Sequence, residues 1–136
     1  MAAQESDGGE GSLLGDTSFR RKFAALEIDM ITADWTDLYL SSGKAVGESV
    51  GGGAASIKKM LASQKSQDIA ELAVDVLGNY AQPDQRRGLG AYPQESPIGP
   101  AYALTPTTRH INNRASTVYG GSNEVQHNIL ARLLGL

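Results

Sequence analysis

The sequence contains no cysteine, which excludes disulfide bonds, thiolate metal ligands and cysteine nucleophiles. It has no basic surplus either, because 12 lysines and arginines stand against 15 aspartates and glutamates. We therefore expect no nucleic-acid partner. No apolar run approaches the roughly 20 residues that span a bilayer, so membrane insertion is not expected. These absences favour a cytoplasmic protein.

Aromatic residues and metal-ligand patterns are also scarce. One Trp, two Phe and five Tyr in 136 residues predict a core of small aliphatic side chains. His110 and His127 lie on different predicted helices without further ligands at metal spacing, so no metal site is expected. Alternation of the kind typical of β-strands is missing, and we find no internal repeat. The sequence therefore predicts an all-α fold.

The chain begins with an acidic, glycine-rich segment that has almost nothing to bury. We expect residues 1–15 to be a disordered lead-in, because ordering them would cost entropy without gaining apolar contacts. Residues 16–136 are predicted to form one domain. A first helix is expected from the capping types at Asp16 to about Ser42. Its two apolar faces predict two packing neighbours, as in a bundle, and consist of Phe19, Phe23, Leu26, Met30 and Ala33 on one side and Ile28, Ile31, Trp35 and Leu38 on the other.

The next segment, Gly43–Gly53, holds five glycines and is predicted to be a connector. A phosphate-binding loop would require a Lys-Ser or Lys-Thr pair after the glycines and a preceding strand, and the strand is missing. A second helix is expected from about Ala54 to Val76. Its apolar face comprises Ile57, Leu61, Ile69, Leu72 and Val76. Gly78 and Asn79 would then end this helix, because these residue types tolerate the left-handed conformation.

Residues 81–100 contain four of the five prolines and are predicted to be a loop. Arg86 and Arg87 in this loop fit a solvated turn, and the alternative is a contact with a nucleotide phosphate. A third helix is expected from about Thr107 to Thr117, since Pro106 disfavours an earlier start. A fourth begins at Ser122, with an apolar face of Val125, Ile129, Leu130, Leu133 and Leu134.

The segment 119–136 combines a diglycine turn, a helix cap and an apolar helix. Gly120 and Gly121 let the backbone approach a ligand closely. Ser122 is a favourable N-cap for a helix whose first amides point back at the turn. This arrangement is typical of a seat for an anion or a polar ligand.

The stretch 116–136, STVYGGSNEVQHNILARLLGL, resembles the C-terminal signature of acyl-CoA dehydrogenases. LAVDVLGNY at 72–80 is similar to the segment before a flavin contact of that family, and the helix at 19–40 resembles its C-terminal helical domain. The resemblance covers residues 16–136. It implies an up-down helical bundle that is incomplete, because the family's β-domain and the first long helix of its bundle have no counterpart here.

The resemblance also implies a function. The family binds FAD between subunits and converts acyl-CoA thioesters into trans-2-enoyl-CoA. We expect this chain to contribute flavin and thioester contacts and oligomer packing, and to be inactive alone. FAD would be bound only together with the rest of the enzyme or a partner subunit. Acyl-CoA and a second copy or a full-length acyl-CoA dehydrogenase subunit are the expected partners. The alternatives are a non-catalytic helical partner or scaffold subunit, and a degraded gene product.

The resemblance places the substrate at Tyr119, Gly120, Gly121 and Arg132. The Gly120 amide would stabilise a developing enolate. Many relatives carry the catalytic glutamate at the position of Gly120, so no catalytic residue is expected in this chain. Glu124 is a nearby carboxylate, but a glutamate in a first helical turn is also favoured by the helix dipole. Arg132 near a helix C-terminus has the same dipole-based alternative.

Six further positions match flavin contacts of the family: Ser122, Asn123, Glu124, Asp75, Gly78 and Asn79. The alternative for Ser122 is that its hydroxyl only caps the helix. The family usually offers a glutamine at the position of Asp75, and an ionised aspartate cannot donate a hydrogen bond. For Gly78 and Asn79, helix termination is the alternative role.

Overall fold

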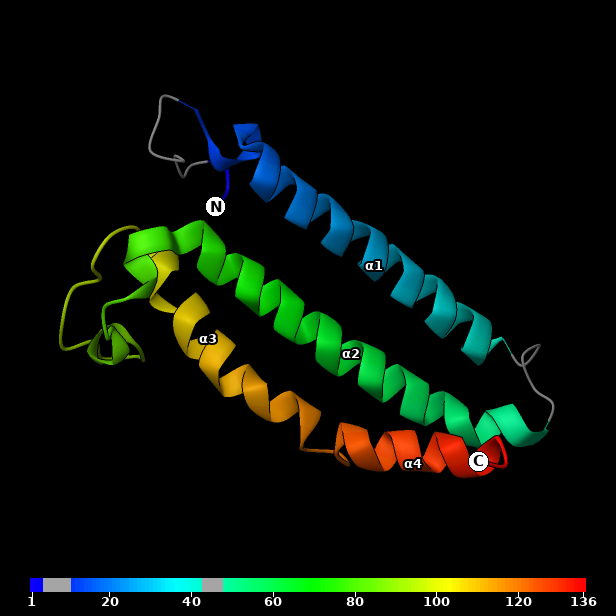
Figure 1. The fold of residues 1–136 in the computed structure, drawn as a ribbon. Helices are drawn as coiled ribbons and strands as arrows, with labels where there is room; N and C mark the ends of the chain where they lie inside the picture. Colours follow the sequence, from blue (N-terminus) through cyan, green and yellow to red (C-terminus); the bar gives the residue numbers. More distant parts are fainter. Residues whose placement is uncertain (4–10, 43–47) are drawn as a thin grey trace. The chain divides into compact units, whose positions relative to one another are not determined.

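A computed structural model describes residues 1–3, 11–42 and 48–136, with side chains of the second helix described from residue 53. Within these ranges the fold consists of helices without strands, which confirms the predicted fold class (Figure 1). The α-helices are α1 (Thr17–Ser41), α2 (Glu48–Leu77), α3 (Pro106–Asn113) and α4 (Asn123–Leu133). Short 3-10 helices lie at Leu13–Gly15, Gly78–Ala81, Arg86–Gly88, Ala101–Leu104 and Arg114–Thr117. Parts of the predicted lead-in (4–10) and connector (43–47) lie outside the described residues.

Helix α1 begins and ends close to the predicted positions. The Asp16 carboxylate accepts a hydrogen bond from the Phe19 amide at 2.6 Å, which is the interaction of an N-cap. Phe19 is buried and its ring stacks on Phe23 with 6.5 Å between ring centroids. The helix ends at Ser41. The capping residue and the apolar period were thus sufficient to locate both ends.

Helix α2 begins earlier than the sequence predicted, at Glu48 instead of about Ala54. The end of the predicted glycine connector is therefore helical. Close packing explains one of these glycines, because a Cβ on Gly53 would lie 2.7 Å from the Leu130 Cδ2 atom of α4. The other end agrees with the prediction. Gly78 adopts a φ of +50° directly after Leu77 and ends the helix.

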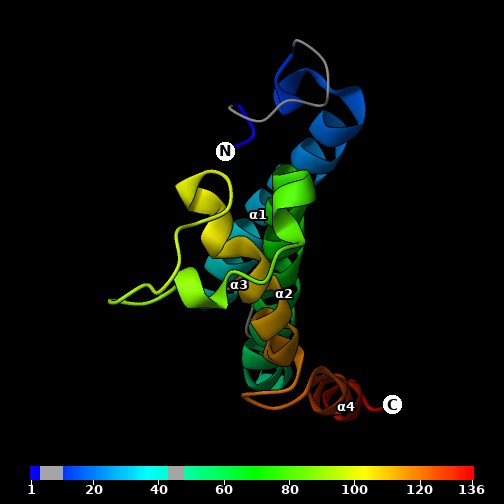
Figure 2. The ribbon, with the colours of Figure 1, turned by 90° about the vertical axis from the view of Figure 1, so that its left-hand side faces the viewer.

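The third helix lies where the sequence predicted it, but its last turn is a 3-10 helix and not an α-helix. Helix α3 starts at Pro106, where the missing amide hydrogen costs nothing in a first turn. It stops at Asn113, and the last predicted turn is the 3-10 helix Arg114–Thr117. The predicted loop, residues 81–100, contains no α-helix or strand, although Ala81 ends one 3-10 helix and Arg86–Gly88 form another. Part of this segment extends to one side of α3 in both ribbon views (Figures 1 and 2).

The chain divides into two compact units, and α1 and α2 each contribute to both. The first unit comprises Met1–Ala25 and Gln67–Arg114. In this unit the Gln67 side-chain amide donates to the Asn113 carbonyl at 3.2 Å, close to the C-terminus of α3. The Thr107 hydroxyl, near the N-terminus of α3, donates to the Ala81 carbonyl at 3.1 Å. Helices α2 and α3 are therefore antiparallel.

The second unit comprises Leu26–Ser66 and Ala115–Leu136. Ion pairs join α1 to α2 in an antiparallel sense, because Asp29 pairs with Lys65 and Asp37 pairs with Lys58, each at 2.7 Å. Helix α4 is also antiparallel to α2. Its first residue, Asn123, lies beside Lys59 and Ser63, whereas Leu130 lies beside Gly53.

Apart from Val76 and Leu77 at the end of the helix, the buried residues in the described part of α2 are small or polar, which differs from the predicted apolar face. Ser56, Ser63 and Ala70 are buried at intervals of seven residues, and Gln67 joins them. Of the predicted face only Val76 is buried, and Ile69 is 42% exposed. Small side chains let neighbouring helices approach closely, and the polar atoms of Gln67 and Ser63 are satisfied by hydrogen bonds. At these positions α2 packs through small side chains that let the neighbouring helices come close, and not through large apolar side chains.

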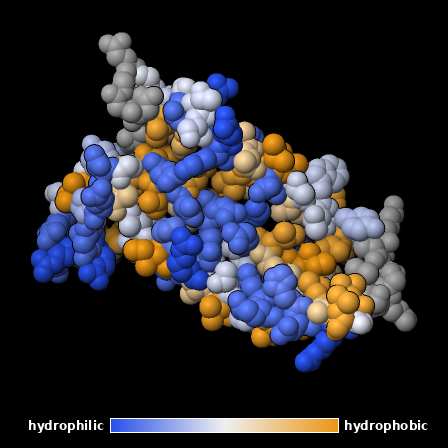
Figure 3. All heavy atoms as spheres, in the orientation of Figure 1, coloured by the Kyte–Doolittle hydropathy of each residue, from blue (hydrophilic) through white to orange (hydrophobic). Residues whose placement is uncertain are grey.

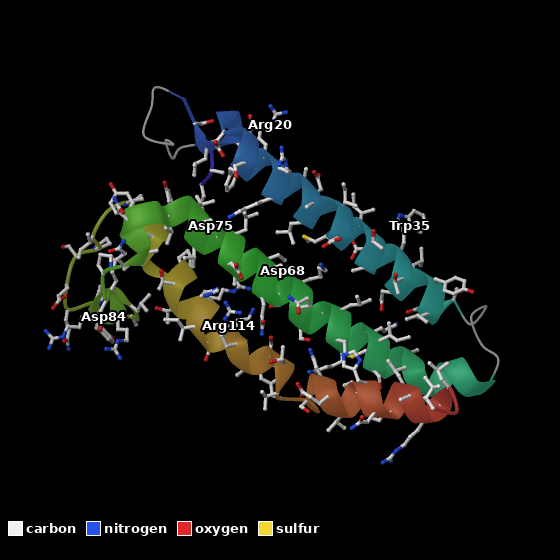
Figure 4. All side chains as sticks on the ribbon, viewed as in Figure 1. Arg20, Trp35, Asp68, Asp75, Asp84 and Arg114 are labelled. Atoms are coloured by element: carbon white, nitrogen blue, oxygen red, sulfur yellow. The ribbon has the colours of Figure 1, made fainter. Side chains whose placement is uncertain are left out.

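A row of large apolar side chains on α1 is exposed. This row, which we call the α1 stripe, consists of Ile28, Ile31, Trp35 and Leu38, which are 64%, 52%, 66% and 58% exposed, respectively. Figure 4 shows Trp35 pointing away from α2. The four residues follow the three- and four-residue spacing of one helical face. No helix among the described residues is long and apolar enough to cross a bilayer.

Candidate functional site

The predicted diglycine turn lies in the second unit between the 3-10 helix Arg114–Thr117 and α4. Gly120 and Gly121 adopt φ angles of +68° and +89°, a region that disfavours residues with a Cβ atom. The approach to the turn is fixed by backbone hydrogen bonds from Val118 and Tyr119 to the Ala115 carbonyl, at 2.9 and 3.0 Å. The positive φ angles explain why both positions of the turn are occupied by glycine.

Ser122 is the N-cap of α4, as predicted. Its backbone is extended, and its hydroxyl oxygen accepts a hydrogen bond from the Val125 amide at 3.4 Å. Its carbonyl accepts from the Gln126 amide at 3.0 Å and so begins the helical ladder. The capping role that the residue type favours is therefore occupied, although the long hydroxyl contact indicates a weak cap.

The amides of the turn remain open. The Gly120 and Gly121 backbone amides donate to no acceptor within the described part of the chain, and both residues are exposed, as is Tyr119. A Cβ at Gly120 would meet no atom within 4 Å, so the space beside it is free. Unpaired amides beside the N-terminus of a helix attract an anion or a carbonyl oxygen.

Asn123 faces α2, and this contact was not predicted. Its side-chain oxygen accepts hydrogen bonds from the Lys59 ammonium group at 2.6 Å and from the Ser63 hydroxyl at 3.3 Å. Because an ammonium group can only donate, Lys59 fixes the orientation of the Asn123 amide. Lys59 also donates to the Thr117 carbonyl at 3.3 Å. The only signal in the sequence was the spacing of Lys59 and Ser63, which places both on one face of α2.

Glu124 is exposed in the first turn of α4. Its own backbone amide and, next, the Ser122 hydroxyl donate to the carboxylate and lower its pKa below the ordinary value. His127 and Lys59 lower the pKa further through their charges. A carboxylate stabilised in this way is a weaker base, which agrees with the view that Glu124 serves the helix terminus. No group of residues in the described ranges could hold a metal ion.

Arg132 lies in the last turn of α4 and is exposed. Its guanidinium group contacts no partner among the described residues. The helix ends just beyond it, where Gly135 takes a φ of +77° and its amide donates to the Arg132 carbonyl at 3.2 Å. A cation at this end is favoured by the helix dipole, and its donors remain accessible to a ligand.

The remaining predicted flavin contacts belong to the first unit. The Asp75 carboxylate, labelled in Figure 4, belongs to α2. It accepts a hydrogen bond from the Lys22 ammonium group at 2.7 Å. This contact raises the pKa of Lys22. Gly78 ends α2, and Asn79 is exposed and has a negative φ. The expected left-handed conformation is thus taken by Gly78 alone.

Both arginines of the loop pair with nearby carboxylates. Arg86 lies 2.6 Å from Asp84, and Arg87 lies 3.1 Å from Glu95. The hydrogen bonds from the Arg86 side chain and backbone lower the pKa of Asp84 to about 2. A cavity of about 480 Å³ lies between this loop and α3 in the first unit. It is lined by Gln82, Pro83, Asp84, Gln85, Arg86, Ala103, Leu104, Thr107, Thr108, Ile111 and Asn112, and none of the predicted site residues is among them.

Comparison with known proteins identifies one family. The model of the family described as acyl-CoA dehydrogenase, C-terminal domain, matches residues 2–135. No curated protein and no solved structure matches the chain significantly.

Proposed function

This chain belongs to the family of acyl-CoA dehydrogenase C-terminal domains, and we propose on that premise that it supplies part of the flavin and thioester site of an acyl-CoA dehydrogenase. The family is generally FAD-dependent. The observation that carries the proposal is the diglycine turn. Its open amides stand directly before the capped N-terminus of α4, where a carbonyl or an anionic group is favoured.

The residues around the turn fit a flavin and a thioester. FAD, when bound, accepts the hydride that leaves the β carbon of the acyl group. Ser122 would hold the flavin through the second lone pair of its hydroxyl oxygen, because the Val125 amide and the Glu124 carboxylate engage the rest of that group. The Asn123 backbone would hold the flavin through its amide. The side chain of Asn123 is engaged by Lys59, so we assign its contact to the backbone. The Glu124 carboxylate is engaged by its own amide and contributes mainly charge.

The glycine amides would serve the thioester. Gly120 and Gly121 have no side chains, so a thioester oxygen can approach their amides closely. Negative charge develops on that oxygen when a proton leaves the α carbon, and two donors aimed at it would lower the barrier. Tyr119 flanks the turn as an exposed apolar surface for the acyl group. Arg132 would bind an anionic or carbonyl group of the acyl-CoA.

A general base is the part of the reaction that this chain does not provide in the proposal. Gly120 has no proton acceptor in its side chain, and Glu124 has a lowered pKa that weakens it as a base. The base would come from another part of the enzyme or from a partner subunit. We therefore propose that the chain alone does not dehydrogenate acyl-CoA.

The α1 stripe supports packing against such a partner. Four large apolar residues at helical spacing are more than half exposed, and on the face shown in Figure 3 apolar side chains lie between hydrophilic ones. Contiguous exposed apolar residues on one helix face typically mark an interaction surface. We propose that a full-length acyl-CoA dehydrogenase subunit or a second copy of the chain covers them.

Co-purification tests the proposal. The chain is expressed alone and together with a full-length acyl-CoA dehydrogenase subunit, and the flavin absorbance of each purified sample is measured. We expect a stable complex that retains flavin beyond the amount carried by the subunit alone. A stable complex without additional flavin would instead favour the alternative of a non-catalytic helical partner. Failure of the chain to enter any complex would contradict both.

A further inference from the structure

The diglycine turn is held at both ends by one lysine of α2. The Lys59 ammonium group donates to the Thr117 carbonyl before the turn and to the Asn123 side-chain oxygen after it, at 3.3 and 2.6 Å. Within the described residues no backbone hydrogen bond crosses from Tyr119–Gly121 to the first residues of α4. Lys59 is therefore a direct bridge across the turn.

A second, buried layer supports this bridge. Ser63 lies one helical turn after Lys59, and its hydroxyl shares its single proton between the Met60 carbonyl, at 3.0 Å, and the Asn123 side-chain oxygen, at 3.3 Å. The Ser116 hydroxyl donates to the Ser63 carbonyl at 3.4 Å, and both serines are buried. Lys59 itself is half-buried. The bridge thus rests on a packed part of α2, which limits its freedom to move.

The charge of Lys59 has two opposite effects at the N-terminus of α4: it attracts the Glu124 carboxylate and opposes the helix dipole. A cation beside the first turn of a helix opposes the helix dipole, which favours anions at that end. The same charge adds to the positive potential that the open amides already produce, and it lowers the pKa of the neighbouring Glu124. This positive potential is favourable for a negatively charged group bound at the turn.

We propose that Lys59 is a positioning residue for the site at the diglycine turn: it holds Thr117 and Asn123 together so that the Gly120 and Gly121 amides keep a fixed direction, and its charge strengthens their attraction for an anionic oxygen. This inference rests on the proposed function for the nature of the ligand. The bridge itself rests only on the contacts between α2, the turn and α4.

The variant Lys59→Met tests the bridge without any ligand. The order of the Gly120 and Gly121 amides is measured by the heteronuclear ¹⁵N NOE, with Lys58→Met as the matched control. Lys58 is the adjacent residue and pairs with Asp37 on α1, so its loss leaves the turn intact. We expect the NOE at both glycines to fall in Lys59→Met alone. Equal values in the two variants would overturn the proposal.

Two more variants keep the test decisive. If Lys59→Met does not fold, Asn123→Ala removes the other end of the bridge, and the glycine NOE must fall there as well. Lys59→Arg keeps the charge and the donors. In the complex with a full-length subunit, we expect Lys59→Met to weaken FAD retention about 10-fold and Lys59→Arg to restore most of it. Equal FAD retention in Lys59→Met and Lys58→Met would overturn the functional part.

The two readouts separate the possible failures. A fall in the glycine NOE together with a complex that never binds flavin would contradict the proposed function and leave the bridge standing. A flavin-containing complex with an unchanged NOE would contradict the bridge and leave the proposed function standing.

Discussion

The Lys22 ammonium group lies 2.7 Å from the Asp75 carboxylate, at the α2 position that we propose corresponds to a flavin-contacting glutamine of the family. The aspartate is therefore already engaged by a cation of the same unit. Because the side chains of Lys22 and Asp75 are 60% and 39% exposed, water and salt screen the pair and it contributes little to stability. An ionised aspartate also cannot donate to a flavin oxygen, so this position does not act as the glutamine does.

The first prediction concerns Asp75→Gln. The new amide group can donate, so we expect FAD to be held more tightly in the complex with a full-length subunit. The thermal unfolding midpoint of the chain should stay within error. Asp37→Asn is the control, because it breaks a comparable pair with Lys58 away from the predicted contacts. Weaker FAD retention in Asp75→Gln than in the control would argue against a flavin contact at this position.

The Lys22–Asp75 pair also predicts how its contribution to stability changes at alkaline pH. Asp75 raises the pKa of Lys22, so the stabilisation is fully present below the ordinary lysine value of 10.5. It is lost as the pH rises through the raised pKa. In Asp75→Gln the pKa of Lys22 should therefore fall back towards its ordinary value, and a Lys22 pKa that stays raised in an NMR titration of this variant would contradict the assigned cause.

The second prediction concerns the backbone of the turn. Gly120→Ala should destabilise the chain by about 1 kcal/mol, because an alanine at a φ of +68° is strained although the space beside it is free. Gly120→Asn should cost less, since asparagine tolerates this region better. Gly121→Ala should cost more, because its Cβ would also displace the Gln126 side chain. Urea denaturation measures all three, and equal costs would contradict the assignment of strain.

The third prediction concerns acid titration of the loop. Arg86 lowers the pKa of Asp84 to about 2 from 3.8. The stabilisation from this pair is therefore present above the ordinary value and is lost as the pH falls towards 2. Carbon NMR of the side-chain carboxyl group should give this midpoint directly. Arg86→Gln should raise the pKa only part of the way towards its ordinary value, because the backbone amide of residue 86 still donates to Asp84. Arg87→Gln should move it only slightly, because Arg87 acts through charge alone.

The fourth prediction uses the single tryptophan as a probe. Trp35 is 66% exposed within the α1 stripe, so its fluorescence reports when that face is covered. We expect its emission to shift to shorter wavelength when the chain meets its partner. Ile31→Lys should prevent the shift while the helical circular dichroism stays unchanged, because Ile31 is exposed and a lysine there removes no core contact. A shift that persists in Ile31→Lys would place the partner elsewhere.

Local signals in the sequence predicted most of the helix ends. Asp16 and Ser122 cap α1 and α4, and Gly78 ends α2 in the left-handed conformation. Each of these depends on a side chain or a glycine at one position, which the sequence shows directly. The diglycine turn is another feature that depends on glycines at known positions, so the sequence shows it directly as well.

Tertiary packing decided what the sequence could not show. Helix α2 begins at Glu48 although the glycines of its first turns have a low helix propensity. One of them, Gly53, lies where α4 comes too close for a side chain. The buried positions Ser56 and Ser63 carry no apolar signal. Lys59 and Asn123 are 64 residues apart, so no local pattern reveals their contact.

Ser122→Gly separates the two roles of the serine hydroxyl and tests the central claim most directly. Glycine is nearly as good an N-cap as serine, costing only a few tenths of a kcal/mol, whereas Ser122→Ala should cost about 1 kcal/mol. The measurement is the dissociation constant of FAD from the complex with a full-length subunit. We predict that Ser122→Gly raises it about 3- to 10-fold without lowering the unfolding midpoint appreciably. An unchanged dissociation constant would show that the hydroxyl only caps α4 and would contradict a flavin contact at Ser122.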